Sequence, residues 1–297
     1  MSDVLLDSDR VAAPFSERSA EGVPSRYPTV IEPRSAWRLV DWRELVEYRD
    51  LFRFLIWRSI KVRYAQSAIG IGWAIIQPVF SMLIFSVIFG RFAGISSDGV
   101  PYAIFSFAAL VPWTYFANAL SESADSLVSN SNMISKVYFP RLILPMTAVG
   151  SKLLDFAIAS TILAGMMIWY GLTPNSGALM LPLLVVLMML TAVGMGMWFT
   201  ALAIQYRDVK HASGFIVQSL MYAAPVVYPL SIVPEVYHPY YALYPMVSVI
   251  EGFRSALLGT QPMPWGLIAI SSASAAIIAL SGCLYFRSRE RLFADVA

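Results

Sequence analysis

The residue types that usually perform catalysis are few in this chain and widely separated. Asp7-Ser8-Asp9 has the spacing with which two carboxylates hold the metal of a sugar transferase, but a three-residue match in a polar tail is readily produced by chance. Two histidines, His211 and His238, are too few for a histidine-based metal site. No glycine precedes a lysine anywhere, so the chain has no phosphate-binding loop of the GxxxxGK[ST] type. We therefore expect no catalytic residue, no metal site and no cofactor in this chain.

Two pairs of oppositely charged residues lie one helical turn apart. Lys152 and Asp155 are expected to pair at the end of an apolar segment, which argues against a proton-relay role for Asp155. Glu251 and Arg254 are expected to pair as well. Their pair either stabilises a local helix or forms an outer gate or dimer latch. The lone Cys283 rules out an intrachain disulfide.

The composition is that of an integral membrane protein. Of the 297 residues, 58% are hydrophobic and only 13% are charged, whereas soluble domains average about 25% charged residues. The mean hydropathy is +0.63. An ordinary soluble enzyme is therefore excluded. The net charge of +2, with no basic face on a domain scale, gives no support for nucleic-acid binding.

Charge-free runs predict six membrane-spanning helices, because a bilayer core of roughly 30 Å needs about 20 apolar helical residues. One charge-free run of 51 residues is too long for one span, and the turn-forming string GLTPNSGA at 171–178 divides it into a helical hairpin. The predicted fold class is all-α. The predicted spans are about 66–90, 100–120, 148–170, 179–204, 212–233 and 266–286.

Four further segments complete the predicted organisation. Residues 1–36 are a disordered polar tail, and residues 37–64 form an amphipathic helix in the headgroup plane, ahead of a membrane domain at 65–287. Within that domain, residues 235–260 are semi-polar and interrupted by prolines. They are predicted to form two short re-entrant helices. Residues 288–297 form a second polar tail.

The distribution of basic residues predicts the orientation in the membrane. Nineteen of the 21 lysine and arginine residues fall on the side that holds the N-terminus, and only Arg91 and Arg254 fall on the other side. Lysine and arginine are enriched in cytoplasmic loops. Both termini are therefore predicted to be cytoplasmic.

Five collinear motifs carry a family resemblance. They are IKVRYAQSAIGIGWAIIQPVFSMLIFSVIFG (60–90), LVPWTYFANAL (110–120), SNSNMISKVYFPRLILP (129–145), QYRDVKHASGFIVQSLMYAAPVVYP (205–229) and IEGFRSALLG (250–259). From about residue 41 onward the chain resembles the ABC transporter type-2 permeases that export polysaccharides. It departs from the family at Ser59, where an acidic residue is frequent, and at Tyr244, where asparagine is frequent.

The resemblance implies a function and a set of partners. Such permeases are homodimers in the bacterial cytoplasmic membrane, and they pair with two separate subunits that bind ATP and Mg²⁺ and hydrolyse the ATP. Their substrates are polyprenyl-diphosphate-linked glycans such as O-antigen, capsular or teichoic-type polymers. The chain itself would then be non-catalytic. Two other functions stay open: a small-molecule or drug exporter of the same family, and a membrane enzyme acting on polyprenyl lipids.

Candidate functional residues fall into four groups. The cytosolic loop 121–145 and the loop after the fourth span are expected to contact the ATPase through Glu122, Asp125, Asn132, Lys136, Tyr138, Arg207 and Asp208. The basic face of the interface helix is expected to attract a diphosphate head group through Arg58, Lys61 and Arg63. Glu251 and Arg254 are the outer-gate candidates. Aromatic rings in the spans, which either line a sugar path or pack against lipid, are Trp73, Phe80, Phe85, Phe89, Tyr102, Trp113, Tyr115, Phe116, Tyr222 and Tyr228.

Overall fold

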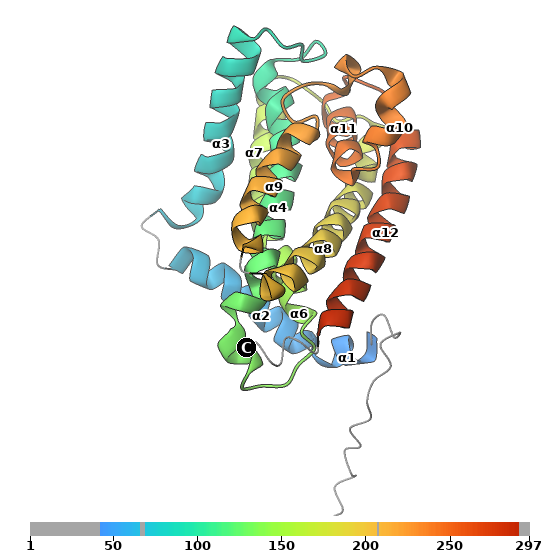
Figure 1. Ribbon diagram of the computed structural model, residues 1–297. Helices are drawn as coiled ribbons and strands as arrows, with labels where there is room; N and C mark the ends of the chain where they lie inside the picture. The colour runs from blue at the N-terminus through green and yellow to red at the C-terminus, as the bar shows by residue number, and fades with distance from the viewer. Residues whose placement is uncertain (1–41, 66–68, 207, 291–297) are drawn as a thin grey trace, which may run out of the picture. The chain divides into compact units, whose positions relative to one another are not determined.

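A computed structural model describes residues 42–65, 69–206 and 208–290, all of which belong to one compact unit, Ala36–Ala297. The regular structure of these residues is helical throughout (Figure 1). The predicted tail at 1–36, residues 291–297 of the predicted tail at 288–297, Asp7-Ser8-Asp9 and Arg207 lie outside the described residues. The first two residues of the tail predicted at 288–297 belong instead to the last described helix, α12 (Trp265–Arg289).

Among the described residues, five helical segments are long and apolar enough to cross a membrane, which confirms the prediction of an all-helical membrane protein. The first consists of η1 (Gly70–Gly72), α3 (Trp73–Phe85) and the π-helical η2 (Ser86–Phe92). The others are α4 (Tyr102–Ser129), α6 (Ile143–Ser151) with α7 (Leu153–Trp169), η3 (Ser176–Met180) with α8 (Leu181–Gln205), and α12 (Trp265–Arg289). A turn separates α7 from η3 as GLTPNSGA predicts, with Gly171 at φ +67°.

Helix α4 lies at the centre of the bundle. It contacts α3, α6, α7, α8, α9 (Val209–Ala223) and α11 (Pro245–Leu258), and nearly every side chain from Ile104 to Phe116 is buried. This run is apolar or small on all faces, the pattern of a helix surrounded by other helices. Its first charged residue is Glu122, so the charged part of α4 lies near its C-terminal end.

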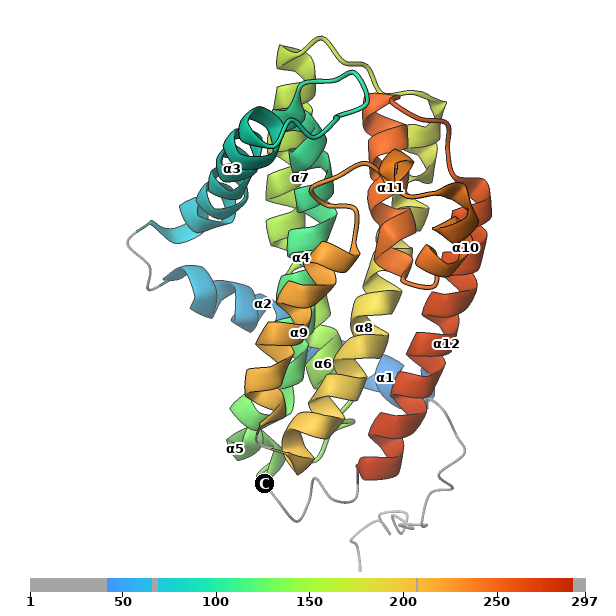
Figure 2. The same ribbon diagram turned by 45° about the horizontal axis from the view of Figure 1, so that its top comes forward.

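The predicted amphipathic helix is two helices, α1 (Trp42–Glu47) and α2 (Arg49–Ala65). They lie at the end of the bundle that also holds α5 (Ser131–Ile134) and the C-terminal end of α12 (Figures 1 and 2). Leu55 is buried against the bundle, whereas Arg53 and Arg58 on other faces of α2 are exposed. Helix α2 therefore presents one apolar side to the bundle, as its amphipathic pattern predicts.

In the predicted fifth span, 212–233, the α-helix α9 ends at Ala223, ten residues before the predicted end of the span. Ala224 is extended because it precedes Pro225, and a residue before proline avoids the helical region. At about 1.5 Å per residue, the 15 residues of α9 reach about 22 Å, less than a bilayer core. This helix is consequently absent from the five long apolar segments.

The chain still passes from one end of the bundle to the other between α8 and α12. Helix α8 ends beside the start of α9, and α12 begins at the opposite end (Figures 1 and 2). The intervening residues form α9, η4 (Leu230–Ile232), η5 (Glu235–Tyr237), α10 (His238–Tyr241) and α11. Helix α11 contacts α4, α8 and α12, and all of its residues except Leu257 are buried.

Candidate functional site

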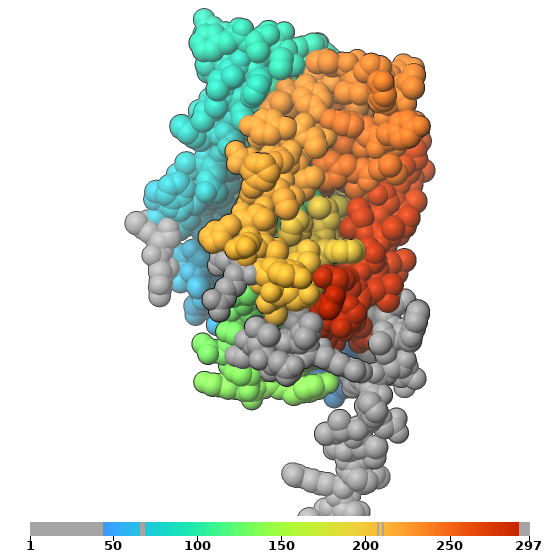
Figure 3. All heavy atoms as spheres, in the orientation of Figure 1, coloured from blue at the N-terminus to red at the C-terminus, as the bar shows by residue number. Residues whose placement is uncertain are grey.

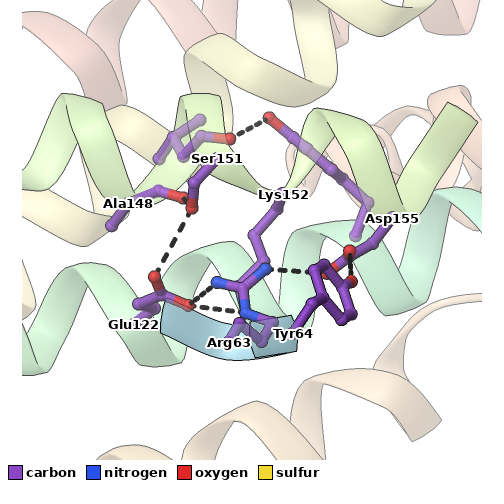
Figure 4. A network of polar contacts seen from close by, with 9 residues as sticks. Arg63, Tyr64, Glu122, Ala148, Ser151, Lys152 and Asp155 are labelled. Atoms are coloured by element: carbon purple, nitrogen blue, oxygen red, sulfur yellow. Dashed lines mark hydrogen bonds and ion pairs between the residues drawn. The ribbon is translucent and has the colours of Figure 1, made fainter. Parts of the chain in front are cut away.

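A cluster of four charged side chains joins α2 to the bundle (Figure 4). Arg63, in the last turn of α2, directs its two terminal nitrogens at different helices. Its Nη2 lies 2.6 Å from Oε2 of Glu122 on α4, and its Nη1 lies 2.9 Å from Oδ2 of Asp155 on α7. A guanidinium group suits this task because its donors are held in a fixed planar fork.

Lys152 and Tyr64 complete this cluster. Lys152 lies at the break between α6 and α7, and its Nζ is 2.5 Å from Oε2 of Glu122. The Tyr64 hydroxyl donates to Oδ1 of Asp155. Burial, together with this hydrogen bond, raises the pKa of Tyr64 to about 12, so the phenol stays protonated at neutral pH. The positive charges of Arg63 and Lys152 therefore equal the negative charges of Glu122 and Asp155 in this partly buried cluster.

The structure corrects one sequence prediction here: Lys152 pairs with Glu122 and not with Asp155, its neighbour one turn along the chain. Arg63, predicted to attract a head group, is paired with Glu122 and Asp155. Glu122, predicted to contact an ATPase, accepts bonds from both cations. Arg63 lies 59 and 92 residues from its partners, so no local spacing in the sequence indicates these contacts.

A cavity of about 410 Å³ lies beside this cluster, between α2, α4 and α6. Arg58 and Arg63 line it from α2, and Glu122, Asp125 and Asn130 line it at and just beyond the end of α4. Two nearly buried hydroxyls, of Ser126 and Thr147, belong to its wall and have no hydrogen-bond partner within the described protein. Leu55, Ser59 and Val62 of α2 also line this cavity.

The other predicted ATPase contacts lie at the same end of the bundle. Asn132, Lys136 and Tyr138 are exposed on the segment that follows α4. The Tyr138 hydroxyl donates to Oε1 of Glu44 on α1 at 3.5 Å. Asp208 is exposed at the start of α9. The exposed Lys61 lies 4.7 Å over the ring of Trp57.

A second charged pair lies deep inside the chain. The predicted pair of Glu251 and Arg254 forms, with 3.0 Å between Oε1 and Nη1. Arg254 is only 1% exposed. Its Nη2 donates to the carbonyl of Val226 at 2.8 Å, and its Nη1 to that of Tyr228 at 3.2 Å. Its guanidinium also lies 3.7 Å over the ring of Phe105 on α4.

The Arg254 contacts explain how the chain can leave the helical conformation after α9. Pro225 has no backbone N–H, so the helical hydrogen bonds of this region are interrupted. The buried guanidinium supplies donors to two of the carbonyls in the non-helical stretch. Glu251 and Arg254 are both buried within one copy of the chain. In this arrangement neither side chain is exposed to form the predicted latch with a second copy.

The predicted aromatic residues separate into two groups. Trp113, Tyr115 and Phe116 are 4%, 2% and 0% exposed, and they belong to the core of the chain rather than to an open surface. Periodicity cannot reveal this difference, because α4 is apolar on every face. The exposed members are Trp73, Phe80 and Tyr222, and the partly buried members are Phe85, Phe89, Tyr102 and Tyr228.

An apolar groove of about 720 Å³ lies between α8, α9, α10 and α12. Figure 3 shows it as a hollow between the gold atoms of α9 and the red atoms of α12. The aromatic residues that line it were not among the sequence-predicted ones. They are Trp198, Phe199, Tyr240, Tyr241 and Tyr244. In the described residues, no group of three or more His, Cys, Asp or Glu side chains is placed to hold a metal ion.

Comparison with known proteins places these features in a family context. Residues 50–258 match the model of the ABC-2 type transporter family. The chain is 26% identical to an O-antigen export system permease protein, RfbA, of Myxococcus xanthus, over 85% of this chain and 97% of the relative. The RfbA permease of Klebsiella pneumoniae is 25% identical, over 83% and 95%. The polysialic acid transport protein KpsM of Escherichia coli is 24% identical, over 69% and 80%.

Proposed function

This chain belongs to the ABC-2 type transporter family, and from that premise we propose that it is the membrane subunit of a polysaccharide exporter. Its cargo is a polyprenyl-diphosphate-linked glycan such as O-antigen, carried across the bacterial cytoplasmic membrane. The observation that carries the proposal is the match to O-antigen export permeases over nearly the whole of those relatives. The match to the family model, over residues 50–258, includes α2 from Asp50 onward and the buried α11.

The proposed topology has six crossings. The start of α1 and the end of α12 lie at the same end of the bundle, which requires an even number of crossings (Figure 1). Five are the long apolar segments. The sixth is the segment from α9 to the start of α12, in which α10 and the buried α11 form the re-entrant part.

The end that holds α2 is proposed to face the cytoplasm. Basic residues of the described chain gather there, on α2, on the segment after α4 and at the end of α12. The excess of lysine and arginine on cytoplasmic loops gives this orientation. The predicted head-group residues Arg58 and Lys61 then lie at the inner membrane surface, where a diphosphate would approach.

The proposed transporter contains two copies of this chain and two ATPase subunits, which bind ATP and Mg²⁺. The chain has no phosphate-binding loop of its own. The ATPases would contact the exposed side chains of Asn132, Lys136 and Tyr138 and the adjacent helices α1 and α2. Helix α3, whose apolar side chains are mostly exposed, and α9 would form the interface along which the glycan passes. Phe80 and Tyr222 are exposed aromatic rings on these two helices.

Deletion of the gene in its host tests the proposed function. The deletion strain should lose the cell-surface polysaccharide and accumulate the polyprenyl-linked glycan in its cytoplasmic membrane, and a plasmid copy should restore export. A strain that keeps its surface polysaccharide but becomes sensitive to small toxic molecules would instead identify a small-molecule exporter. Loss of the lipid-linked glycan itself would identify an enzyme of its synthesis.

A further inference from the structure

Helix α2 is attached to the bundle at two separate places. The first attachment is apolar: Leu55 is buried, and Ile56 approaches the backbone of α6 so closely that a Cβ on Gly150 would lie 2.9 Å from its Cδ1. The second attachment is polar and lies two turns further along, at Arg63 and Tyr64. The cavity of about 410 Å³ lies alongside the stretch of α2 between them.

This arrangement lets α2 act as a lever. The apolar contact is a fixed point because close-packed side chains resist compression. Beyond Leu55, the side chains of Arg58, Ser59 and Val62 line the cavity, so a tilt of α2 about Leu55 would change the cavity before it disturbed the core. The polar end of the lever would move most, and Arg63 is there.

Arg63 is placed to pass such a movement to two spans at once. Its two ion pairs reach Glu122 on α4 and Asp155 on α7, while Tyr64 adds a second bond to Asp155. Lys152 binds the same Glu122 oxygen, so α4 is also tied to the α6–α7 junction. Charge-assisted hydrogen bonds of this kind are short and strong, and they hold direction as well as distance.

We propose that Arg63 is a positioning residue that couples the movement of α2 to α4 and α7 during ATP-driven transport. An ATPase that displaces α2 would thereby shift the α4 and α7 spans through the Arg63–Glu122–Asp155 contacts. The proposal rests on the proposed function for the existence of an ATPase partner. It assigns Arg63 a role in coupling instead of in binding a head group.

The test uses the permease reconstituted with its ATPase subunit in proteoliposomes. The probe is the polyprenyl-diphosphate-linked glycan extracted from host membranes, and the readout is glycan moved per ATP hydrolysed. Arg63→Gln should lower this ratio about tenfold, within the range of allosteric couplings, while ATP hydrolysis continues. The control is Arg91→Gln, because Arg91 is an exposed cation in η2, outside the helices proposed to contact the ATPase. Its ratio should equal that of the wild type.

Two further variants separate coupling from a merely structural role. Adding Asp155→Asn to Arg63→Gln should lower the ratio less than Asp155→Asn does in the wild type, because the Arg63–Asp155 contact is already lost. Arg63→Lys keeps the positive charge but loses the planar set of guanidinium donors. Its ratio should therefore lie between those of Arg63→Gln and the wild type. Gel filtration and the unfolding midpoint check that each variant is folded.

Each outcome has a definite reading. A wild-type ratio in Arg63→Gln would overturn the proposal, and so would an equal fall of hydrolysis and transport, which indicates lost assembly. If Arg63→Gln does not fold, the glycan moved per ATP is measured in Arg63→Lys and Tyr64→Phe instead. A wild-type ratio in both of these variants would overturn the proposal. If the wild type moves a fluorescent drug but no glycan, the proposed function fails, and the ratio measured with that drug still tests Arg63.

Discussion

Replacing Arg254 with methionine should destabilise the protein more than any change to an exposed arginine. Arg254 is 1% exposed and binds Glu251, which is 7% exposed. Methionine keeps most of the side-chain volume but removes every donor. The carboxylate of Glu251 then loses its cation, and the carbonyls of Val226 and Tyr228 lose the donors that the guanidinium supplies.

The size of the effect follows from these contacts. Removing one partner of a buried ion pair costs about 3–5 kcal/mol. Glu251→Gln should cost less than Arg254→Met, because the guanidinium keeps its carbonyl bonds. In the double change Arg254→Met with Glu251→Met no buried charge is left without a partner. The carbonyls of Val226 and Tyr228 remain orphaned, at about 1–3 kcal/mol each, and that of Phe105 loses a longer bond of 3.4 Å. The double variant should therefore be more stable than Arg254→Met alone.

Equilibrium unfolding in mixed detergent micelles, followed by tryptophan fluorescence, measures these differences. Arg91→Met is the control, because Arg91 is exposed in η2. It should unfold within about 0.5 kcal/mol of the wild type, as surface substitutions do. An Arg254→Met variant as stable as Arg91→Met would refute the proposed role of the guanidinium. A double variant less stable than Arg254→Met would refute the assignment of the cost to an unpaired carboxylate.

Two other predictions concern packing and orientation. Gly282→Ala should lower stability by about 1–3 kcal/mol, because the new Cβ would lie 2.3 Å from the backbone oxygen of Gly194. Gly165→Ala, where no atom lies within 4 Å, should be tolerated in the same unfolding assay. In a cysteine-free background, Thr173→Cys should react with a membrane-impermeant thiol reagent added to intact cells, and Asn132→Cys should react only after permeabilisation. The reverse labelling pattern would contradict the proposed orientation.

Apolar patterning was sufficient to predict the helical framework. Charge-free runs locate the five long apolar segments, and GLTPNSGA locates the turn between α7 and η3. These features depend on local hydrophobicity and turn chemistry, which a single sequence carries. The same reasoning extended the fifth span past Pro225, since apolar residues continue on both sides of the proline. The helix nevertheless ends at Ala223, where backbone geometry outweighs hydropathy.

The candidate sites were predicted less completely, because they depend on contacts between distant segments. The Glu251–Arg254 pair spans one helical turn and was therefore visible in the sequence. Arg63 and its two carboxylates come from three helices, so their meeting depends on how those helices pack. Likewise, the burial of Trp113 depends on the helices that surround α4, which hydropathy does not reveal.

Reconstitution of the purified chain with and without its ATPase tests the central claim most directly. Proteoliposomes that contain both subunits should translocate the polyprenyl-linked glycan when ATP and Mg²⁺ are supplied. Proteoliposomes that contain this chain alone should neither translocate the glycan against a gradient nor alter it chemically. ATP-independent uphill translocation, or a changed glycan, in the presence of the purified chain alone would contradict the account.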